Sequence, residues 1–330
     1  MNGTRLYELL YALVATDGRE AALFGDCAPL AREAFARSFV GSSFPELWFE
    51  LPLAGDPWFD LHVGAKHGDL DEVTSFGEGS CGGAPEAFAW FAAQGPVARQ
   101  LFLSWDVSSG DMEAPAVQLL RGTRDTELAC GFLTVAGRAD AAPAYRLFEE
   151  RLSEGWFACY VGVFPRRREP FLRVECIPRI RQQHAYAKDP ALLAEHLRSI
   201  GFEGMGPTLL DRCQSLARIP FRLEFQFDVT PEGTAGRTFG ASVRFASPPG
   251  SEAWASFDAE GAAGELMRQV EAWGLADDRW RLLPGTMFAK RARMAGESCM
   301  LWCRPTFLKL RWRDGEPLDA KAYLVAGVQP

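Results

Sequence analysis

Basic and aromatic side chains alternate with apolar ones near the end of the chain, in residues 305–326. Successive side chains of a strand point to opposite faces. Lys309 and Arg311 therefore share one face of a first strand, and Lys321 and Tyr323 share one face of a second. Cations at this spacing can bind an anionic group such as a diphosphate, and a tyrosine ring can stabilise a carbocation. The solvated face of an ordinary sheet has the same pattern, so one hairpin alone does not indicate a binding site. Recurrence of the pattern in other segments would favour a binding site.

Four earlier segments repeat this alternation. Each has two strand-like runs separated by turn residues, which predicts an antiparallel hairpin. The paired runs are residues 46–51 with 58–63, 101–107 with 116–120, 157–163 with 171–177, and 221–229 with 239–245. Cations concentrate in the later pairs, and acidic residues concentrate in the earlier ones.

The alternation selects candidate residues for three roles. The candidates for binding an anion are Arg173, Arg222, Arg244, Lys309, Arg311 and Lys321. The candidates for shielding a carbocation or stacking on an aromatic ring are Trp48, Trp58, Tyr160 and Tyr323. Glu46 or Glu50 could accept a proton from an aromatic substrate. In the alternative interpretation, the cations form cross-strand ion pairs with Glu175, Glu224 and Asp228 and bind no ligand.

Segments of helical character separate the hairpins, at residues 85–91, 142–154, 190–200, 207–217 and 262–273. We also expect helices over residues 1–40, the last of them at 30–40, and a single strand at 128–135. Consecutive hairpins separated by helices predict an α+β fold, with an antiparallel sheet covered by helices on one face. About ten strands approach the limit of an open sheet, and closure removes exposed edges. We therefore expect one domain, residues 1–330, built as a closed barrel of five strand-pair-plus-helix units.

Helices on the outside of such a barrel cover the apolar face of every strand, so the polar faces must point inward. The interior is then a wide polar chamber and a ready-made binding site. Besides the candidates above, the residues expected to point inward are Asp60, His62, Ser104, Asp106, Gln118, Glu175, Glu224, Gln226 and Ser242.

The composition is typical of a globular protein, with 48% hydrophobic and 24% charged residues among 330. The net charge of −8 argues against nucleic acid or an anionic membrane as a partner. No apolar run approaches the roughly 20 residues that span a bilayer. The eight cysteines form no Cys-x-x-Cys pair, and several lie in apolar strand patterns, as reduced cysteines do. We expect a cytoplasmic location.

The repeated strand pairs and helices, the polar chamber and the Lys321-x-Tyr323 sequence on a late strand resemble the ABBA, or PT-barrel, aromatic prenyltransferases. The resemblance is architectural and spans most of the chain. It implies transfer of an isoprenoid from its diphosphate to an electron-rich aromatic ring, in a small molecule or a peptide side chain. It also implies a role for each matching residue: the diphosphate would contact Arg173, Arg222, Arg244, Lys309 and Lys321, Tyr323 would shield the cation, and Glu46 or Glu50 would be the base.

No Asp-Asp-x-x-Asp sequence is present to hold magnesium, and metal dependence is not universal in this family. We therefore expect no required cofactor, with Mg²⁺ as an alternative that no motif supports. Residues 77–82 match the Gly-x-Gly-x-x-Gly fingerprint but lack the buried strand that a dinucleotide site requires before it. The leading hypothesis is a prenyltransferase. The alternatives are a non-catalytic barrel that binds a peptide or small ligand, and an open sheet that mediates protein contacts.

Overall fold

We describe the protein from a computed structural model, which covers residues 10–27, 29, 46–66, 84–107, 111–164, 172–245, 257–294 and 297–329. The helix expected at 30–40 and the glycine motif at 77–82 lie outside these residues. The remaining elements expected from the sequence can be compared with the structure directly.

Five antiparallel hairpins supply the main strands, at the positions expected from the alternating pattern. They are β1 (Glu46–Pro52) with β2 (Asp60–Ala65), β3 (Ala98–Asp106) with β4 (Asp111–Arg121), β5 (Trp156–Val163) with β6 (Leu172–Pro178), β7 (Arg222–Val229) with β8 (Ala235–Arg244), and β10 (Glu297–Arg313) with β11 (Glu316–Gln329). A further strand, β9 (Phe288–Met294), was not expected.

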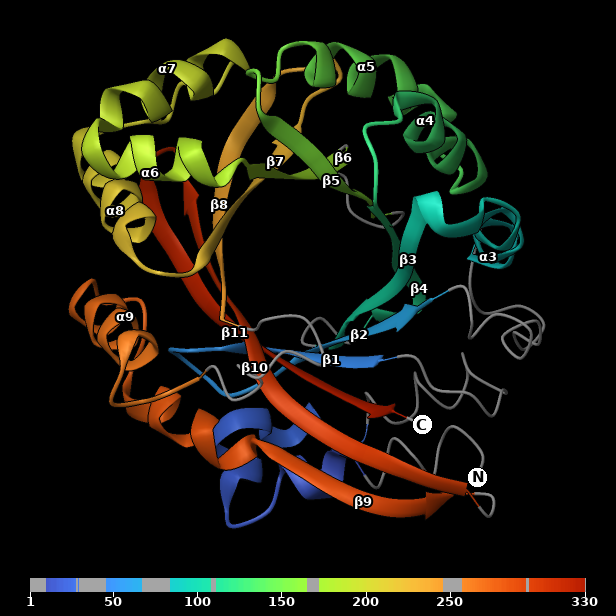
Figure 1. Cartoon of the computed structure of the whole chain (residues 1–330), viewed down its shortest axis with the longest axis vertical. Coiled ribbons are helices and arrows are strands. Elements are labelled where there is room, and N and C mark those ends of the chain that lie inside the picture. Colours follow the sequence, from blue (N-terminus) through green and yellow to red (C-terminus); the bar gives the residue numbers. More distant parts are fainter. Residues whose placement is uncertain are drawn as a thin grey trace.

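The sheet closes into a barrel (Figure 1). Strands β1 to β8 follow one another in chain order, β10 and β11 come next, and β11 pairs with β1 to complete the ring. All neighbouring strands are antiparallel. β9 pairs only with the first half of β10 and extends the sheet beyond the ring. In the described part of the chain, the predicted closed barrel of ten antiparallel strands is therefore confirmed.

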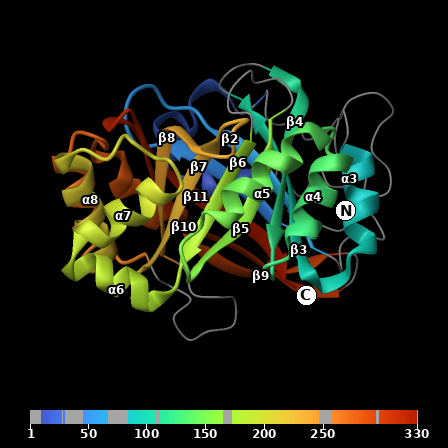
Figure 2. The same cartoon turned by 90° about the horizontal axis from the view of Figure 1, so that it is seen from above.

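Helices surround the barrel, as Figures 1 and 2 show. They are α3 (Ala84–Ala93), α4 (Thr126–Val135), α5 (Ala142–Glu150), α6 (Ile180–Lys188), α7 (Pro190–Ser199), α8 (Pro207–Arg218) and α9 (Ala262–Ala272), with short helical turns η1 (Glu20–Phe24) and η7 (Asp278–Thr286) among the smaller elements. The apolar faces of the strands lie in the core beneath them: Leu223, Phe225 and Phe227 of β7 are fully buried. The polar faces are thus left to line the interior.

The last hairpin has the geometry that its turn sequence predicts. Asp314 and Gly315 have φ values of 54° and 83° and connect β10 to β11. Two consecutive residues with positive φ form the kind of tight turn that matches the twist of a hairpin. The first strand is longer than expected, because β10 begins at Glu297 and has a register shift between Pro305 and Phe307.

Residues 128–135 form part of helix α4, so the strand expected there was wrong. The Asp125 side chain accepts a hydrogen bond from the backbone N–H of Leu128 and caps the helix. Leu128 and Phe132, one helical turn apart, are both buried. A short apolar run does not distinguish a buried strand from a buried helix by periodicity alone, and the cap decides between them here.

None of the helices in the described residues has both the length and the apolar character that would be needed to cross a lipid bilayer.

Candidate active site

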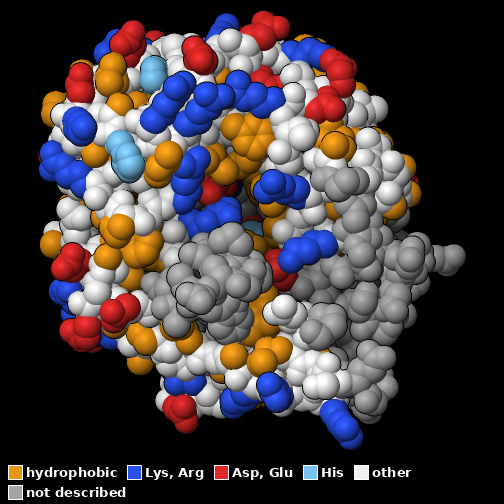
Figure 3. Space-filling model, in the orientation of Figure 1, with side chains coloured by type: hydrophobic (Ala, Val, Ile, Leu, Met, Phe, Trp, Pro, Cys, Tyr) orange, Lys and Arg blue, Asp and Glu red, His pale blue; other side chains and the backbone are white. Residues whose placement is uncertain are grey.

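A cavity of about 300 Å³ occupies the interior of the barrel. Figure 3 shows a hollow in the face seen down the ring, with basic side chains grouped beside it. All the residues expected to point inward line this cavity except Trp58 and Arg222. The period-two pattern therefore placed the polar faces of the strands correctly.

Trp58 and Arg222 are corrections to the expected lining. Trp58 precedes the first residue of β2, so strand alternation does not fix its direction; its ring lies 4.6 Å from Lys321 Nζ, outside the set of lining residues. Arg222 is the first residue of β7 and donates a hydrogen bond to the backbone carbonyl of Pro178. It lines a separate pocket with Arg99, Arg124 and Arg179.

Four of the six predicted anion-binding cations form ion pairs with carboxylates. The pairs are Arg173 with Asp228 at 2.7 Å, Arg244 with Glu224 at 3.0 Å, Lys321 with Glu50 at 2.8 Å, and Arg311 with Asp319 through two hydrogen bonds. The ion-pair alternative is thus correct for much of the barrel wall. Both arginines that pair with an aspartate keep N–H groups outside the pair: Arg173 uses Nε, and Arg311 uses Nε and Nη2.

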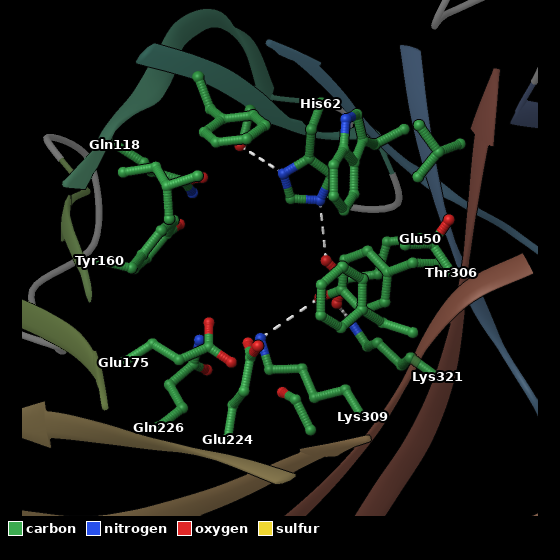
Figure 4. A pocket seen from close by; sticks show the side chains of 18 of the residues that line it. Glu50, His62, Gln118, Tyr160, Glu175, Glu224, Gln226, Thr306, Lys309 and Lys321 are labelled. Atoms are coloured by element: carbon green, nitrogen blue, oxygen red, sulfur yellow. Dashed lines mark hydrogen bonds and ion pairs between the residues drawn. The ribbon is translucent and has the colours of Figure 1, made fainter. Parts of the chain in front are cut away.

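Lys309 differs from these four because no carboxylate in the described residues forms an ion pair with it. Its ammonium group lies 3.3 Å from the hydroxyl of Tyr323. Burial lowers the pKa of Lys309 to about 8, against the opposing charges of Glu50 and Glu175. Figure 4 shows Lys309 extending into the cavity, where Glu175 also points. A buried ammonium group with only partial compensation is suited to binding an anion.

Lys309 also belongs to a group of like charges. The charges of Arg173 and Arg311 lower the pKa of Lys309 further, and Arg311 has the same effect on Arg173. These three residues, the cation cluster, come from β6 and β10 and repel one another across the cavity. The phenols of Tyr160 and Tyr323 lie close enough to interact with Arg173 and Arg311, respectively. An anion placed among the three cations would relieve their mutual repulsion.

Four aromatic rings form a second group beside the cation cluster. Trp48 stacks on Phe307 with 5.6 Å between ring centroids and meets Phe102 edge-on at 5.5 Å. Tyr323 lies 6.4 Å from Trp48 and 6.3 Å from Phe307. All four rings line the cavity. We call this group the aromatic cluster, and its faces could stabilise a carbocation.

The two candidate bases are both engaged by neighbouring residues. Glu46 accepts hydrogen bonds from Lys66 at 2.6 Å and from Gln100 at 3.1 Å. Burial alone would raise the pKa of Glu50, but Lys321 and the hydrogen bond with His62 hold that pKa well below its usual value. The role of each as base remains a prediction, and Glu50 on its own is a weak proton acceptor.

Two other carboxyl groups have raised pKa values. Burial raises the pKa of Asp60 to about 6, although the charge of Lys321 opposes this change. Burial likewise raises the pKa of Glu224 to about 7, against the charge of Arg244 and with the help of Glu175. Both groups therefore carry a proton for part of the time near neutral pH.

The pKa of Glu224 makes a prediction about stability. Between about pH 4.5 and pH 7 the folded protein keeps a proton that the unfolded chain has released, so the free energy of unfolding falls as the pH rises. Replacing Glu224 with Gln, which does not titrate, removes this pH-dependent loss of stability. Urea unfolding at pH 5 and pH 8 should show a drop in the free energy of unfolding for the wild type that exceeds the drop for Glu224→Gln by about 2.5 kcal/mol. Equal drops would contradict the raised pKa.

No group of three or more His, Cys, Asp or Glu side chains within the described ranges has an arrangement that could hold a metal ion.

Several lining residues were absent from the candidates selected by sequence. Gln100 and Phe102 lie on the same face of β3 as Ser104. Gln100 was missed because β3 begins at Ala98, before the strand expected at 101–107, and Phe102 was missed because it is apolar. Thr306 and Phe307 are adjacent in the chain, yet both line the cavity. The register shift between Pro305 and Phe307 explains why both side chains reach the cavity. No pattern in the sequence predicts this shift.

The closed ring of antiparallel strand pairs, surrounded by helices and enclosing a polar cavity, is the PT-barrel fold of the ABBA prenyltransferases. The structure is similar to the crystal structure of the prenyltransferase PriB in its apo form, with a TM-score of 0.54, 11% sequence identity, and coverage of 98% of this chain and 95% of that one. It is also similar to 6-dimethylallyl tryptophan synthase, with a TM-score of 0.51, 11% identity, and coverage of 98% and 96%. No protein-family model and no curated protein sequence matches the chain.

Proposed function

We propose that this protein transfers an isoprenoid from its diphosphate to an electron-rich aromatic ring. The observation that carries the proposal is the position of the cation cluster directly beside the aromatic cluster, with Tyr323 in contact with both. Both similar structures carry the names of prenyltransferases, which supports the same class of reaction here.

The cation cluster binds the diphosphate, and the aromatic cluster stabilises the isoprenoid cation. The ammonium group of Lys309 and the N–H groups of Arg173 and Arg311 that lie outside their ion pairs bind the diphosphate. They stabilise its charge as the bond between the isoprenoid carbon and the diphosphate oxygen breaks. The faces of Trp48 and Tyr323 stabilise the allylic cation until the aromatic ring attacks it. Side chains supply the positive charge, so the proposal requires no metal ion.

The reaction is completed by loss of a proton from the aromatic acceptor. In this proposal the proton finally resides on the imidazole of His62, which is hydrogen-bonded to Glu50 on the first hairpin. The acceptor molecule is a small aromatic compound or an aromatic side chain of a peptide. The six free cysteines of the described part suit a reducing compartment, and we propose that the protein acts in the cytoplasm.

The proposal is tested by incubating the protein with dimethylallyl or geranyl diphosphate and a set of indoles, phenols and aromatic peptides. We expect release of diphosphate and an acceptor whose mass has increased by one isoprenoid unit. Geraniol mixed with inorganic diphosphate is the control, because it supplies the same parts without the bond that must break. If neither diphosphate nor alkylated product forms with any acceptor, the enzyme proposal fails.

A second candidate function is a barrel that binds a ligand without catalysis. The observation in its favour is that Arg173, Arg244, Arg311 and Lys321 each pair with a carboxylate. Ion pairs on the wall reduce the net positive charge that a diphosphate would meet. Thermal stabilisation by a peptide or aromatic compound, without any by an isoprenoid diphosphate, would favour this second function.

A further inference from the structure

Three side chains on neighbouring strands form a continuous hydrogen-bonded chain on the cavity wall. Ser104 Oγ of β3 lies 2.5 Å from His62 Nδ1 of β2, and His62 Nε2 lies 2.8 Å from Glu50 Oε2 of β1. Strand pairing sets this alignment, because His62 is directly opposite Ser104 in the β2–β3 ladder. Figure 4 shows His62 and Glu50 on the wall, with a dashed line from each ring nitrogen of His62, and all three residues line the cavity.

The charge on Glu50 determines which nitrogen of His62 carries the proton. Lys321 Nζ lies 2.8 Å from Glu50 Oε1, and the pKa of Glu50 is held well below its usual value by Lys321 and His62 despite burial. An ionised carboxylate can only accept hydrogen bonds, so His62 Nε2 must donate. In the neutral ring Nδ1 then has a free lone pair, and Ser104 must be the donor to it.

Glu50 cannot easily take a further proton, because it already accepts hydrogen bonds from several groups. Lys321 and His62 contact its two oxygens, and Tyr323 is a third hydrogen-bond partner. Ser104 lies at the other end of the chain. Its hydrogen points toward His62, which leaves the lone pairs of its oxygen available to the cavity.

From this geometry we infer that Ser104, and not Glu50, receives the proton of the aromatic acceptor. The inference rests on the proposed prenyl transfer. As the acceptor's O–H or N–H proton moves to Ser104 Oγ, the hydroxyl proton of Ser104 moves to His62 Nδ1. The ring becomes an imidazolium ion, which Glu50 stabilises through Nε2–H. Ser104 is thus a catalytic residue, and His62 and Glu50 are positioning residues that act through it.

The same geometry narrows the class of acceptor. His62 is opposite Trp48 in the β1–β2 ladder, and the His62 ring centroid lies 5.8 Å from that of Tyr323. An acceptor whose ring rests on the aromatic cluster therefore places its substituents near Ser104. The acceptor must carry a proton on a heteroatom conjugated with the ring, as phenols and indoles do. Ring systems without such a proton, such as an O-methylated phenol, should be poor substrates.

The test compares Ser104→Ala and His62→Ala with the wild type, using geranyl diphosphate and the best phenol or indole acceptor. General acid–base groups typically contribute 10²- to 10⁴-fold, so we expect alkylation to fall by about 100-fold or more in both variants. Thermal stabilisation by geranyl diphosphate should persist, because neither residue belongs to the cation cluster. Added imidazole should restore part of the activity of His62→Ala and none of that of Ser104→Ala.

His196→Asn is the matched control. His196 Nδ1 also lies within hydrogen-bonding distance of a hydroxyl group, 2.6 Å from that of Tyr186, but it belongs to helix α7 and is not among the cavity-lining residues. The His196→Asn variant should alkylate the acceptor at the wild-type rate. A Ser104→Ala variant that alkylates as fast as the wild type would overturn the proton transfer while leaving prenyl transfer intact. A wild type that releases no diphosphate would instead overturn the proposed function.

A spectroscopic measurement tests the proton chain without any substrate. Nitrogen-15 NMR of the imidazole rings distinguishes the two neutral tautomers of His62. We expect the tautomer with its proton on Nε2. A proton on Nδ1 would mean that His62 donates to Ser104, and the inferred direction of transfer would then be wrong.

Discussion

Replacing Lys309 with methionine will weaken the binding of an isoprenoid diphosphate and, at the same time, stabilise the free protein. The two effects have one cause. Lys309 is a buried ammonium group that forms no ion pair with a carboxylate in the described residues. Glu50 and Glu175 offset the cost of its burial only in part, and a bound anion would offset more of it.

The size of both effects follows from the position of Lys309. Burial lowers its pKa from 10.5 to about 8, so at pH 7 the unfolded chain holds the charge more readily than the folded protein does. Methionine has a similar shape and no charge, and it should increase the free energy of unfolding by about 1–3 kcal/mol. Removing one partner from a desolvated charge pair usually costs about 2–5 kcal/mol, which predicts diphosphate binding roughly 30- to 4000-fold weaker.

Urea unfolding and thermal shift with geranyl diphosphate measure the two effects separately. Lys290→Met is the matched control, because Lys290 lies on β9, outside the barrel ring, and is exposed. It should leave diphosphate binding unchanged. If Lys309→Met lowers the stability of the free protein, or binds the diphosphate as well as the wild type does, then Lys309 does not have the role assigned to it.

Replacing Glu50 with alanine should destabilise the protein more than most single substitutions. Lys321 lies 2.8 Å from Glu50, and both side chains are at most 10% exposed. Breaking a buried ion pair by removing one partner typically costs about 3–5 kcal/mol, because the other charge remains buried. Asp60 lies 3.6 Å from Lys321 and keeps part of the compensation, so we expect the lower end of this range.

A double-mutant cycle separates the ion pair from other effects of the substitution. The variant with both Glu50→Ala and Lys321→Met should recover most of the lost stability in urea unfolding, because no unpaired charge remains. The control is Glu127→Ala, since Glu127 pairs with Arg146 on the surface and should change stability little. If the double variant is as unstable as the sum of the single variants, the pair does not account for the effect.

The alternation of polar and apolar residues was sufficient to predict the barrel and most of its lining. The reason is physical: helices cover one side of every strand, so the period-two pattern fixes which residues face the cavity. The pattern alone places Lys309 and Lys321 on the wall. The pattern gave a wrong or missing prediction where regular strand alternation is absent. Trp58 lies outside the strands, and Thr306 lies at the register shift in β10.

The pairing of residues across strands could not be read from the sequence. Arg173 is opposite Asp228 and His62 is opposite Ser104 because β6 and β2 adopt particular registers with their neighbours. Those registers depend on long connections, such as the 32 residues between Ala65 and Ala98, which include helix α3. Only a short turn fixes register locally, as Asp314 and Gly315 do for the last hairpin. The hydrogen-bonded chain at Glu50 therefore had no sequence signal.

The most direct test is calorimetric titration of the protein with a geranyl diphosphate analogue whose leaving oxygen is replaced by sulfur, so that binding is measured without reaction. We expect one site per chain, and at pH 8 an uptake of about half a proton as the bound anion restores the charge of Lys309, detected by repeating the titration in buffers of different ionisation enthalpy. The proton uptake should be absent in Lys309→Met. Failure of the analogue to bind, or equal binding and proton uptake in both proteins, would contradict the assignment of the cavity as an isoprenoid diphosphate site.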